Sequence, residues 1–172
     1  MIDYINKFRL DGNTAFVVGG LGLIGSETFI ALSSAGANVV VADWEQTPHG
    51  DNRFSFELLD LTKLEDLDSK LSLIIAKHGP IHTLVNCAYP RTKDWPQNNF
   101  AEVKLESMRK NIDIHMNSSI WIARTIANHM IDHEEGGSII NMSSIYGILG
   151  QDLSVYEGTT MRENMTYAAI KG

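Results

Sequence analysis

The sequence predicts an α/β fold in which a parallel, doubly wound sheet lies between two layers of helices. Short runs of strand length alternate with longer segments of helical periodicity. The runs are continuously apolar instead of alternating with polar residues, as expected for strands that are buried on both faces. The stretch TAFVVGGLGLIG, from Thr14 to Gly25, joins the first run to a helix through three glycines spaced three apart.

The elements are expected to follow one another in the order of that pattern, in a single domain that spans residues 1–172. Strands are expected at 15–18, 38–43, 54–58, 83–86 and 138–142, and helices near 23–34, 64–75 and 105–131. We expect Gly36 to close the first helix in a left-handed conformation and Thr62 to cap the second. The segment from Tyr89 to Asn99 has two prolines and no periodicity, so it either borders a substrate cleft or is a surface excursion.

Composition narrows the class of partner. The net charge of −7 argues against nucleic acid or an anionic membrane, and favours a small-molecule ligand. No apolar run approaches the roughly 20 residues of a membrane span. The single cysteine, Cys87, cannot form an internal disulfide, and the polar amino terminus does not resemble a signal peptide. We therefore expect a cytoplasmic protein, and interpret His129 and His133 as part of a solvated helix end, with no metal site.

The glycine turn is typical of a nucleotide-binding loop. Gly19 would allow the tight turn, Gly22 the approach of a pyrophosphate, and Gly25 close packing of helix on strand. Asp43 ends the second strand 18 residues after Gly25 (43 − 25), near the spacing at which an acid binds the adenosine ribose. An acid here favours NAD, because it would repel the 2′-phosphate of NADP. Alternatively, the glycine stretch is no more than a glycine-rich turn, and Asp43 is no more than an acid at the end of a strand.

A second set of residues has the chemistry for proton transfer. Tyr167 and Lys171 are four apart, which places them on one face of a helix. An ammonium near the phenol would lower its pKa, so that it could act as an acid or base. Ser144 follows the last predicted strand and could hold a substrate oxygen at the same place. Tyr89 and Lys93 share the four-residue spacing, which we interpret as coincidence because Pro90 follows that tyrosine.

Taken in order, VVGGLGLIG, Asp43, LLDLT, VNCA, IINMSS and YAAIK resemble the short-chain dehydrogenase/reductase family, which implies a Rossmann-type fold. The resemblance implies that Ser144, Tyr167 and Lys171 are catalytic and act on an alcohol or carbonyl beside NAD. Adenine and ribose contacts are implied by the same resemblance. The cofactor-binding residues that it implies are Gly19, Gly22, Leu23, Ile24, Gly25, Asp43, Trp44, Asp60, Leu61, Asn86 and Ala88.

Four departures from the family pattern matter. Leu23 stands where many simple family members carry a glycine. The glycines of the turn are therefore spaced three apart, as in extended members that act on nucleotide sugars. Tyr89 replaces a glycine, which would narrow the cofactor cleft. His115 aligns with the catalytic asparagine, although Asn111 and Asn117 lie close by.

The fourth departure is the interval from Ser144 to Tyr167, 23 residues (167 − 144) where the family has about a dozen. Tyr156 sits at the shorter distance, but Thr160 stands where its lysine would be. We therefore expect an insertion around 153–166. The resemblance also implies further strands after Lys171, so that this chain would be the amino-terminal portion of a longer protein.

The leading hypothesis is an NAD-dependent oxidoreductase that acts on an alcohol or carbonyl, including a sugar or nucleotide sugar. The alternatives are a non-catalytic NAD-binding module and an extended-type nucleotide-sugar epimerase or dehydratase. The segments GGLGLIG, NCAYP and SSIYG are similar to those of family members from surface-sugar and flagellin-glycan pathways. The family's packing implies a homodimer or homotetramer.

Overall fold

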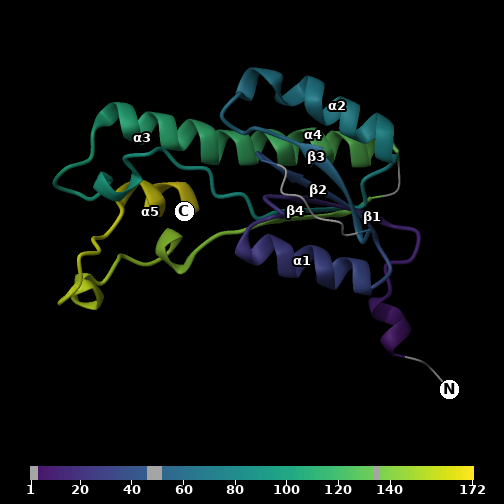
Figure 1. Cartoon of the computed structure of the whole chain (residues 1–172), viewed down its shortest axis with the longest axis horizontal. Coiled ribbons are helices and arrows are strands. Elements are labelled where there is room, and N and C mark those ends of the chain that lie inside the picture. Colours follow the sequence, from purple (N-terminus) through teal and green to yellow (C-terminus); the bar gives the residue numbers. More distant parts are fainter. Residues whose placement is uncertain (1–3, 46–51, 134–135) are drawn as a thin grey trace.

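Five parallel strands form one sheet with the first strand at its centre. The computed structural model describes residues 4–45, 52–133 and 136–172, and its strand order is β3, β2, β1, β4, β5 (Figure 1). Neighbouring strands all run parallel. The strands are β1 (Thr14–Val18), β2 (Asn38–Asp43), β3 (Phe54–Leu58), β4 (Thr83–Asn86) and β5 (Ser138–Asn141). The predicted parallel α/β fold is confirmed.

Burial explains the central place of β1. Each of its five residues is buried, whereas β3 and β5 at the sheet edges keep half-exposed and exposed side chains. The chain passes from one half of the sheet to the other across β1, because β2 and β4 are its two neighbours. Such a reversal opens a crevice at the carboxyl ends of the strands, where ligands bind in sheets of this kind.

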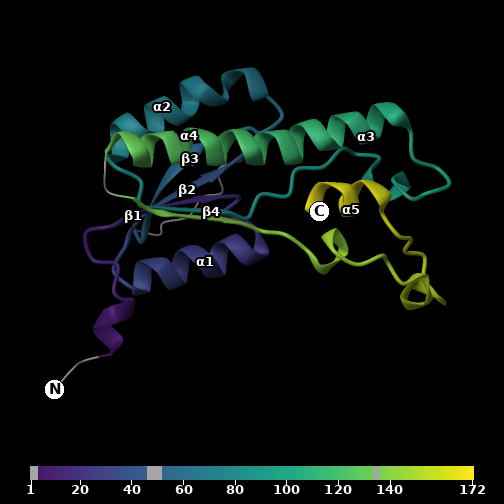
Figure 2. The same ribbon diagram turned by 180° about the vertical axis from the view of Figure 1, so that it is seen from behind.

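Helices cover both faces of the sheet. Helix α1 lies on one face, while α2 and α4 lie side by side on the other (Figures 1 and 2). The α1 face is closed by a cluster that includes Val17, Phe29 and Val41. The opposite face holds a larger cluster, in which Leu71 and Ile126 are among the fully buried side chains. The helices are α1 (Leu23–Ser34), α2 (Leu67–His78), α3 (Leu105–Asn111), α4 (Ser118–Asp132) and α5 (Met165–Lys171).

The start of α2 differs from the sequence prediction. Thr62 does not cap this helix, because its backbone N–H and its hydroxyl both donate to Oδ1 of Asp60, at 3.0 and 2.7 Å. A 3₁₀ turn, Leu64–Asp66, comes first, and α2 then begins at Leu67 without a side-chain cap. Two local hydrogen bonds to an acid outcompete the single bond that capping would give. The predicted closure of α1 is confirmed, since Gly36 has a φ of 103°.

The predicted long helix consists of three parts. A π-helical stretch, Ile112–Asn117, joins α3 to α4, and the whole rod runs beyond the end of the sheet (Figures 1 and 2). Short π-helical stretches inside α-helices are frequent at functional sites. None of the helices in the described ranges is long and apolar enough to cross a membrane.

The segment between the serine turn and α5 extends away from the sheet (Figure 1). Two short 3₁₀ turns, Ile145–Gly147 and Leu153–Tyr156, are its regular structure, and α5 begins at Met165. Helix α5 then lies beside the far part of the long helix, at the carboxyl end of the sheet (Figures 1 and 2). This arrangement brings the last predicted motif back to the strand ends.

Candidate functional site

The glycine turn packs against the end of β4 so closely that side chains would not fit. A Cβ on Gly19, whose φ is 71°, would lie 2.5 Å from Cα of Ala88. A Cβ on Gly25 would collide with the carbonyl oxygen of Gly19. Helix α1 begins after Gly22 with no side-chain cap, so its first N–H groups are open to a ligand. Leu23 and Ile24 stand exposed there. The turn thus has the shape and polarity of a phosphate cradle.

Asp43 braces this cradle from the end of β2. Its Oδ2 accepts a hydrogen bond from the backbone N–H of Leu21 at 3.0 Å, and its Oδ1 accepts one from Trp44 at 2.8 Å. Each carboxylate oxygen can accept a further bond. Trp44 is exposed beside it. The acid is therefore fixed at the strand ends and still able to bind a hydroxyl.

Asp60 and Leu61 follow β3 at the same edge. Burial acts to raise the pKa of Asp60, but hydrogen bonds from Thr62 and the charges of Lys63 and Lys110 hold it below its usual value. Asp60 is thus ionised at neutral pH. The Leu61 side chain is buried in the core cluster under α2.

The side-chain amide of Asn86 forms hydrogen bonds within the protein. Its Nδ2 donates to Oγ of Ser119 at 3.0 Å, and its Oδ1 accepts from the N–H of Ala88 at 3.1 Å. These bonds tie the end of β4 to α4 and fix Ala88 against the glycine turn. Burial raises the pKa of the neighbouring Cys87 thiol, so Cys87 stays protonated and packs as a neutral side chain.

Lys171 links α5 to the end of β5. Its Nζ donates to the carbonyl oxygen of Met142 at 2.6 Å, and the hydroxyl of Ser143 donates to the Lys171 carbonyl at 2.7 Å. Burial lowers the pKa of Lys171. Ser144 follows directly, and its Oγ accepts from the N–H of Tyr146 at 3.3 Å. The serine turn and the end of α5 are thus joined at the carboxyl edge of the sheet.

Tyr167 is held at the start of the same helix. Asn164 caps α5 by accepting from the Tyr167 N–H at 2.8 Å, and its Nδ2 donates to the carbonyl of Trp95 at 3.1 Å. The Tyr167 ring meets Tyr89 edge-on, with the ring centroids 5.8 Å apart. The segment that begins at Tyr89 therefore packs against the helix that carries Tyr167 and is not a free surface excursion, while its place beside a substrate cleft stays a prediction.

The three candidates for the asparagine position lie in different surroundings. Asn111 is buried, and its amide is bonded to Thr92 and Ser107. Asn117 is exposed and donates to Asp113 at 3.0 Å. His115 lies in the π-helical stretch with 3% of its surface exposed.

His115 is the candidate that faces the Tyr167 and Lys171 side of the site. Its ring lies edge-on to Tyr89 at a centroid distance of 5.3 Å. Burial, aided by the charge of Lys171, lowers the pKa of His115 to about 4. Among the described residues, its Nδ1 has no hydrogen-bond partner. The imidazole is consequently neutral at physiological pH.

Sequence reasoning missed the loop residues that hold this site together. Trp95 is buried and packs edge-on against both Tyr89 and Tyr167, at 5.6 and 6.4 Å between ring centroids. Asn98 is buried between the loop and α5, where it accepts from the hydroxyl of Thr166 at 2.7 Å. The sequence predicts that the segment from Tyr89 to Asn99 could border a cleft, but no motif within it marks Trp95 or Asn98.

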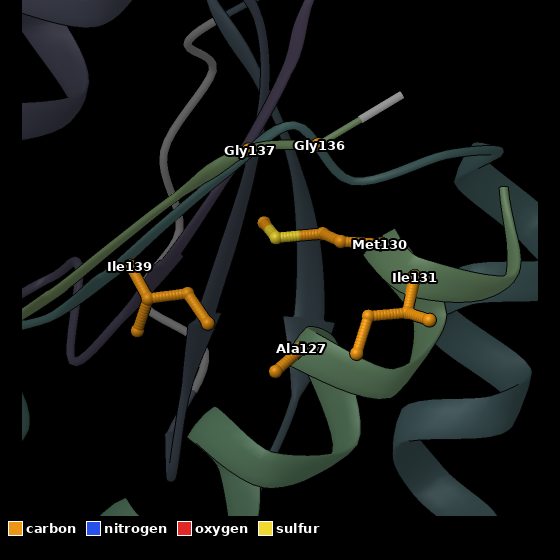
Figure 3. A pocket seen from close by; sticks show the side chains of 6 residues that line it. All are labelled: Ala127, Met130, Ile131, Gly136, Gly137 and Ile139. Carbon is orange, nitrogen blue, oxygen red and sulfur yellow. The ribbon is translucent and has the colours of Figure 1, made fainter. Parts of the chain in front are cut away.

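An apolar pocket lies at the opposite end of the sheet. It has a volume of about 490 Å³ and lies between the end of α4 and the start of β5 (Figure 3). Its lining is apolar and includes Met130, Ile131 and Ile139. The cavity is remote from the polar groups described above, and none of the predicted site residues lines it.

Comparison with known proteins points to one family. The family model for short chain dehydrogenase matches residues 13–159, a range that ends before Tyr167. Post-translational flagellin modification protein A of Campylobacter coli is 27% identical over 172 residues, covering 94% of this chain and 67% of the relative.

Two solved structures share the fold. One is a short chain dehydrogenase from Leptospira borgpetersenii with bound NAD⁺, with a TM-score of 0.82 at 22% identity over 99% of this chain and 64% of the other. A gluconate 5-dehydrogenase from Burkholderia cenocepacia, in complex with NADP and tartrate, has a TM-score of 0.76 at 23% identity, and the coverage is again 99% and 64%. The chain spans about two thirds of the length of these proteins. With a family model matched along most of its length, and with this fold, the chain belongs to the short-chain dehydrogenase/reductase family of oxidoreductases.

Proposed function

We propose that this protein is an NAD-dependent oxidoreductase that transfers a hydride between nicotinamide and an alcohol or carbonyl. The observation that carries the proposal is the bond from Lys171 to Met142. It brings the Tyr167/Lys171 helix to the strand end that bears Ser144, at the same sheet edge as the glycine cradle. The proposed proton-transfer groups and the proposed nucleotide site would therefore lie at one edge of the sheet.

The dinucleotide fits the residues at this edge. The cradle that a Cβ at Gly19 or Gly25 would fill is matched to a pyrophosphate, next to the open N-terminus of α1. Asp43 would bind the adenosine ribose, while Asp60, Leu61, Asn86 and Ala88 would line the adenine and ribose. The bound cofactor supplies or accepts the hydride.

The chain's own residues would manage the proton. Ser144 would donate a hydrogen bond to the substrate oxygen and orient it. In the reducing direction Tyr167 would give its phenolic proton to that oxygen as the carbonyl carbon gains the hydride, and in the oxidising direction it would take the proton back. Lys171 has three N–H donors, of which Met142 takes one, so two are available to the cofactor ribose. His115 would complete the site as a neutral hydrogen-bonding group.

Substitution of the tyrosines tests the catalytic assignment. Tyr167→Phe should abolish turnover and leave NADH binding intact, because the phenyl ring fills the same space without a transferable proton. Tyr156→Phe is the matched control, since Tyr156 stands at the shorter distance from Ser144. Turnover and NADH binding would be measured by absorbance and calorimetry. Retained turnover in Tyr167→Phe would refute the assignment.

The preference for NAD rests on Asp43. An anion at this position repels the 2′-phosphate of NADP, so Asp43→Ser should raise kcat/KM for NADPH relative to NADH. A factor of about ten or more is expected, since removal of a like-charge contact of about 1.4 kcal/mol has that effect. An unchanged ratio would show that another group selects the cofactor.

The three-apart spacing of Gly19, Gly22 and Gly25 favours a second candidate, an extended-type nucleotide-sugar epimerase or dehydratase. Such an enzyme would retain NAD through purification and show no net reduction. A third candidate, a non-catalytic NAD-binding module, would bind NADH in calorimetry without turnover of any alcohol or carbonyl. A sugar or nucleotide sugar is our proposed substrate class, supported by the flagellin-modification relative. The single domain, the cytoplasmic setting and the homo-oligomer stay predictions.

A further inference from the structure

Tyr89 lies at the centre of the aromatic groups around the proposed reaction centre. Its ring is edge-on to three others, with centroid distances of 5.3 Å to His115, 5.6 Å to Trp95 and 5.8 Å to Tyr167. Edge-on pairs of this kind are attractive beyond the area that they bury. The three partners come from the long helix, the loop and α5, so Tyr89 is the side chain on which three separate elements converge.

Two cations lie over the same ring. Nζ of Lys171 is 5.9 Å from the ring centroid, and Cζ of Arg91 is 5.5 Å from it. An aromatic face attracts cations at such distances. The ring therefore interacts with both members of the Tyr167/Lys171 pair, through its contact with the phenol and through its face toward the ammonium.

Tyr89 is also anchored to the cofactor cradle. The preceding residue, Ala88, fits against Gly19 and donates its N–H to Asn86. The backbone that carries Tyr89 is therefore fixed by the strand end and the glycine turn. A ring mounted there holds its partners in a constant relation to the nucleotide site.

We propose that Tyr89 is a positioning residue, whose ring fixes Tyr167 beside the Lys171 ammonium and closes His115 off from water. The first half rests on the proposed function, whereas the closing of His115 does not. Tyr89 is 40% exposed and His115 is 3% exposed, and their rings meet edge-on at 5.3 Å, so the partly exposed tyrosine ring covers one side of the buried imidazole. Family members with a glycine at this position would lack such a barrier.

Removal of the ring has a definite effect on His115. The ionisable groups that act on the two rings are Lys171 and Tyr167 from α5 and Arg91 from the loop, while Cys87, just after β4, acts on Lys171. Burial is the main cause of the low pKa of His115, with the Lys171 charge second. Water admitted in place of the ring stabilises the imidazolium, so the pKa of His115 should rise from about 4 toward the ordinary histidine value of 6.5.

The experiment compares Tyr89→Phe with Tyr89→Leu. Phenylalanine keeps the ring, its edge-on contacts and its face toward Lys171, whereas leucine keeps only apolar volume. The matched control is Tyr4→Leu, because Tyr4 is an exposed tyrosine with the lysine Lys7 over its ring, at 4.9 Å. Ring titrations would be followed by NMR, with His115 assigned from the signal that is lost in His115→Asn.

In Tyr89→Leu we expect the midpoint of the His115 titration to rise by at least about one pH unit, and in Tyr89→Phe and Tyr4→Leu to stay within about 0.3 units. Turnover should fall about tenfold or more in Tyr89→Leu with KM for NADH unchanged, since a displaced proton donor slows chemistry and not cofactor binding. Tyr89→Gln is the second variant should leucine not give a folded protein.

An unchanged His115 titration in a folded Tyr89→Leu or Tyr89→Gln protein overturns the inference, whatever the turnover. If the unaltered protein shows NADH binding and no turnover, the proposed function fails and the titration alone decides whether Tyr89 closes off His115. A raised midpoint in the leucine variant, with the phenylalanine variant unchanged, supports it.

Discussion

The hydroxyl of Thr166 donates a 2.7 Å hydrogen bond to Oδ1 of Asn98, a residue 68 positions earlier in the chain. Both side chains are buried. Asn98 also donates from Nδ2 to Ser107 at 2.9 Å and to the carbonyl of Asp94 at 3.0 Å. One amide thus joins the loop, α3 and the helix that carries Tyr167.

Thr166→Val should therefore destabilise the protein. Valine has the same shape but leaves Oδ1 of Asn98 buried without this donor, at a cost of about 1–3 kcal/mol in the free energy of unfolding. Denaturant unfolding would measure it. The control is Thr125→Val, since the Thr125 hydroxyl makes an exposed bond of 3.5 Å to Asp68. Equal stabilities of the two variants would contradict the proposed contribution of the Thr166–Asn98 hydrogen bond to stability.

Gly147→Ala should disturb the site directly. A Cβ at this position would collide with the carbonyl of Lys171, and the end of α5 would have to move. A displacement of about 1 Å in a catalytic group can cost roughly a hundredfold in rate. Gly150→Ala is the control, because its Cβ would meet nothing within 4 Å. Steady-state turnover and the melting temperature would be compared, and wild-type turnover in Gly147→Ala would show that α5 tolerates the shift.

Glu57 should make stability depend on pH in the acid range. Burial acts to raise its pKa, but hydrogen bonds from Lys77 and His78 outweigh burial and hold the pKa below its usual value. Both bonds are 2.7 Å long. A carboxyl with a depressed pKa contributes stability above its unfolded-state pKa, and this is lost as pH falls through the folded-state pKa.

We therefore expect Glu57→Gln to be less stable than the wild type at pH 7, with a difference that shrinks as pH falls below 4.5, the ordinary pKa of glutamate. Urea unfolding at a series of pH values would measure this. A constant difference between pH 7 and pH 3 would mean that Glu57 contributes through packing and not through its charge.

His115 should make the free energy of unfolding depend on pH in a higher range than Glu57 does. Its pKa is about 4 in the folded protein, against an ordinary value of 6.5 for an exposed histidine, so the unfolded chain binds more protons between these values. The contribution to stability is complete above pH 6.5 and declines as pH falls to about 4, by roughly 3 kcal/mol. His115→Asn should remove this slope. If the slope of stability against pH between 6.5 and 4 is the same in His115→Asn, the imidazole is not the group that titrates.

The fold was largely predictable because its signals are local. The strand from Ala15 to Val18 is a continuous apolar run, and the glycines that follow it can be recognised by spacing alone. Thr62 shows the limit of such reasoning, since whether a threonine caps a helix or bonds to Asp60 depends on competing geometries of similar energy. The π-helical stretch has the composition of an ordinary amphipathic helix, so periodicity cannot distinguish it.

The site was predictable only in its motifs. Ser144, Tyr167 and Lys171 were named from their order and spacing, and their roles stay predictions. The surroundings of Tyr167 depend on residues more than 60 positions away, of which Trp95 and Asn98 carry no motif. A buried amide or indole becomes recognisable as part of a site once the chain has brought its partners together.

The central position of β1 also has a consequence for the order of folding. Partners across β1 and β2, such as Thr14 and Asn38, are 24 positions apart (38 − 14), whereas Ala15 and Thr83 across β1 and β4 are 68 apart (83 − 15). Closing the longer loop costs about 0.9 kcal/mol more in chain entropy. We expect β1, β2 and α1 to assemble first, with the nucleotide cradle's glycines already in place, and the Tyr167 side to join later. Pulse-labelled hydrogen exchange would detect this as protection of β1 and β2 amides ahead of those in β4 and β5.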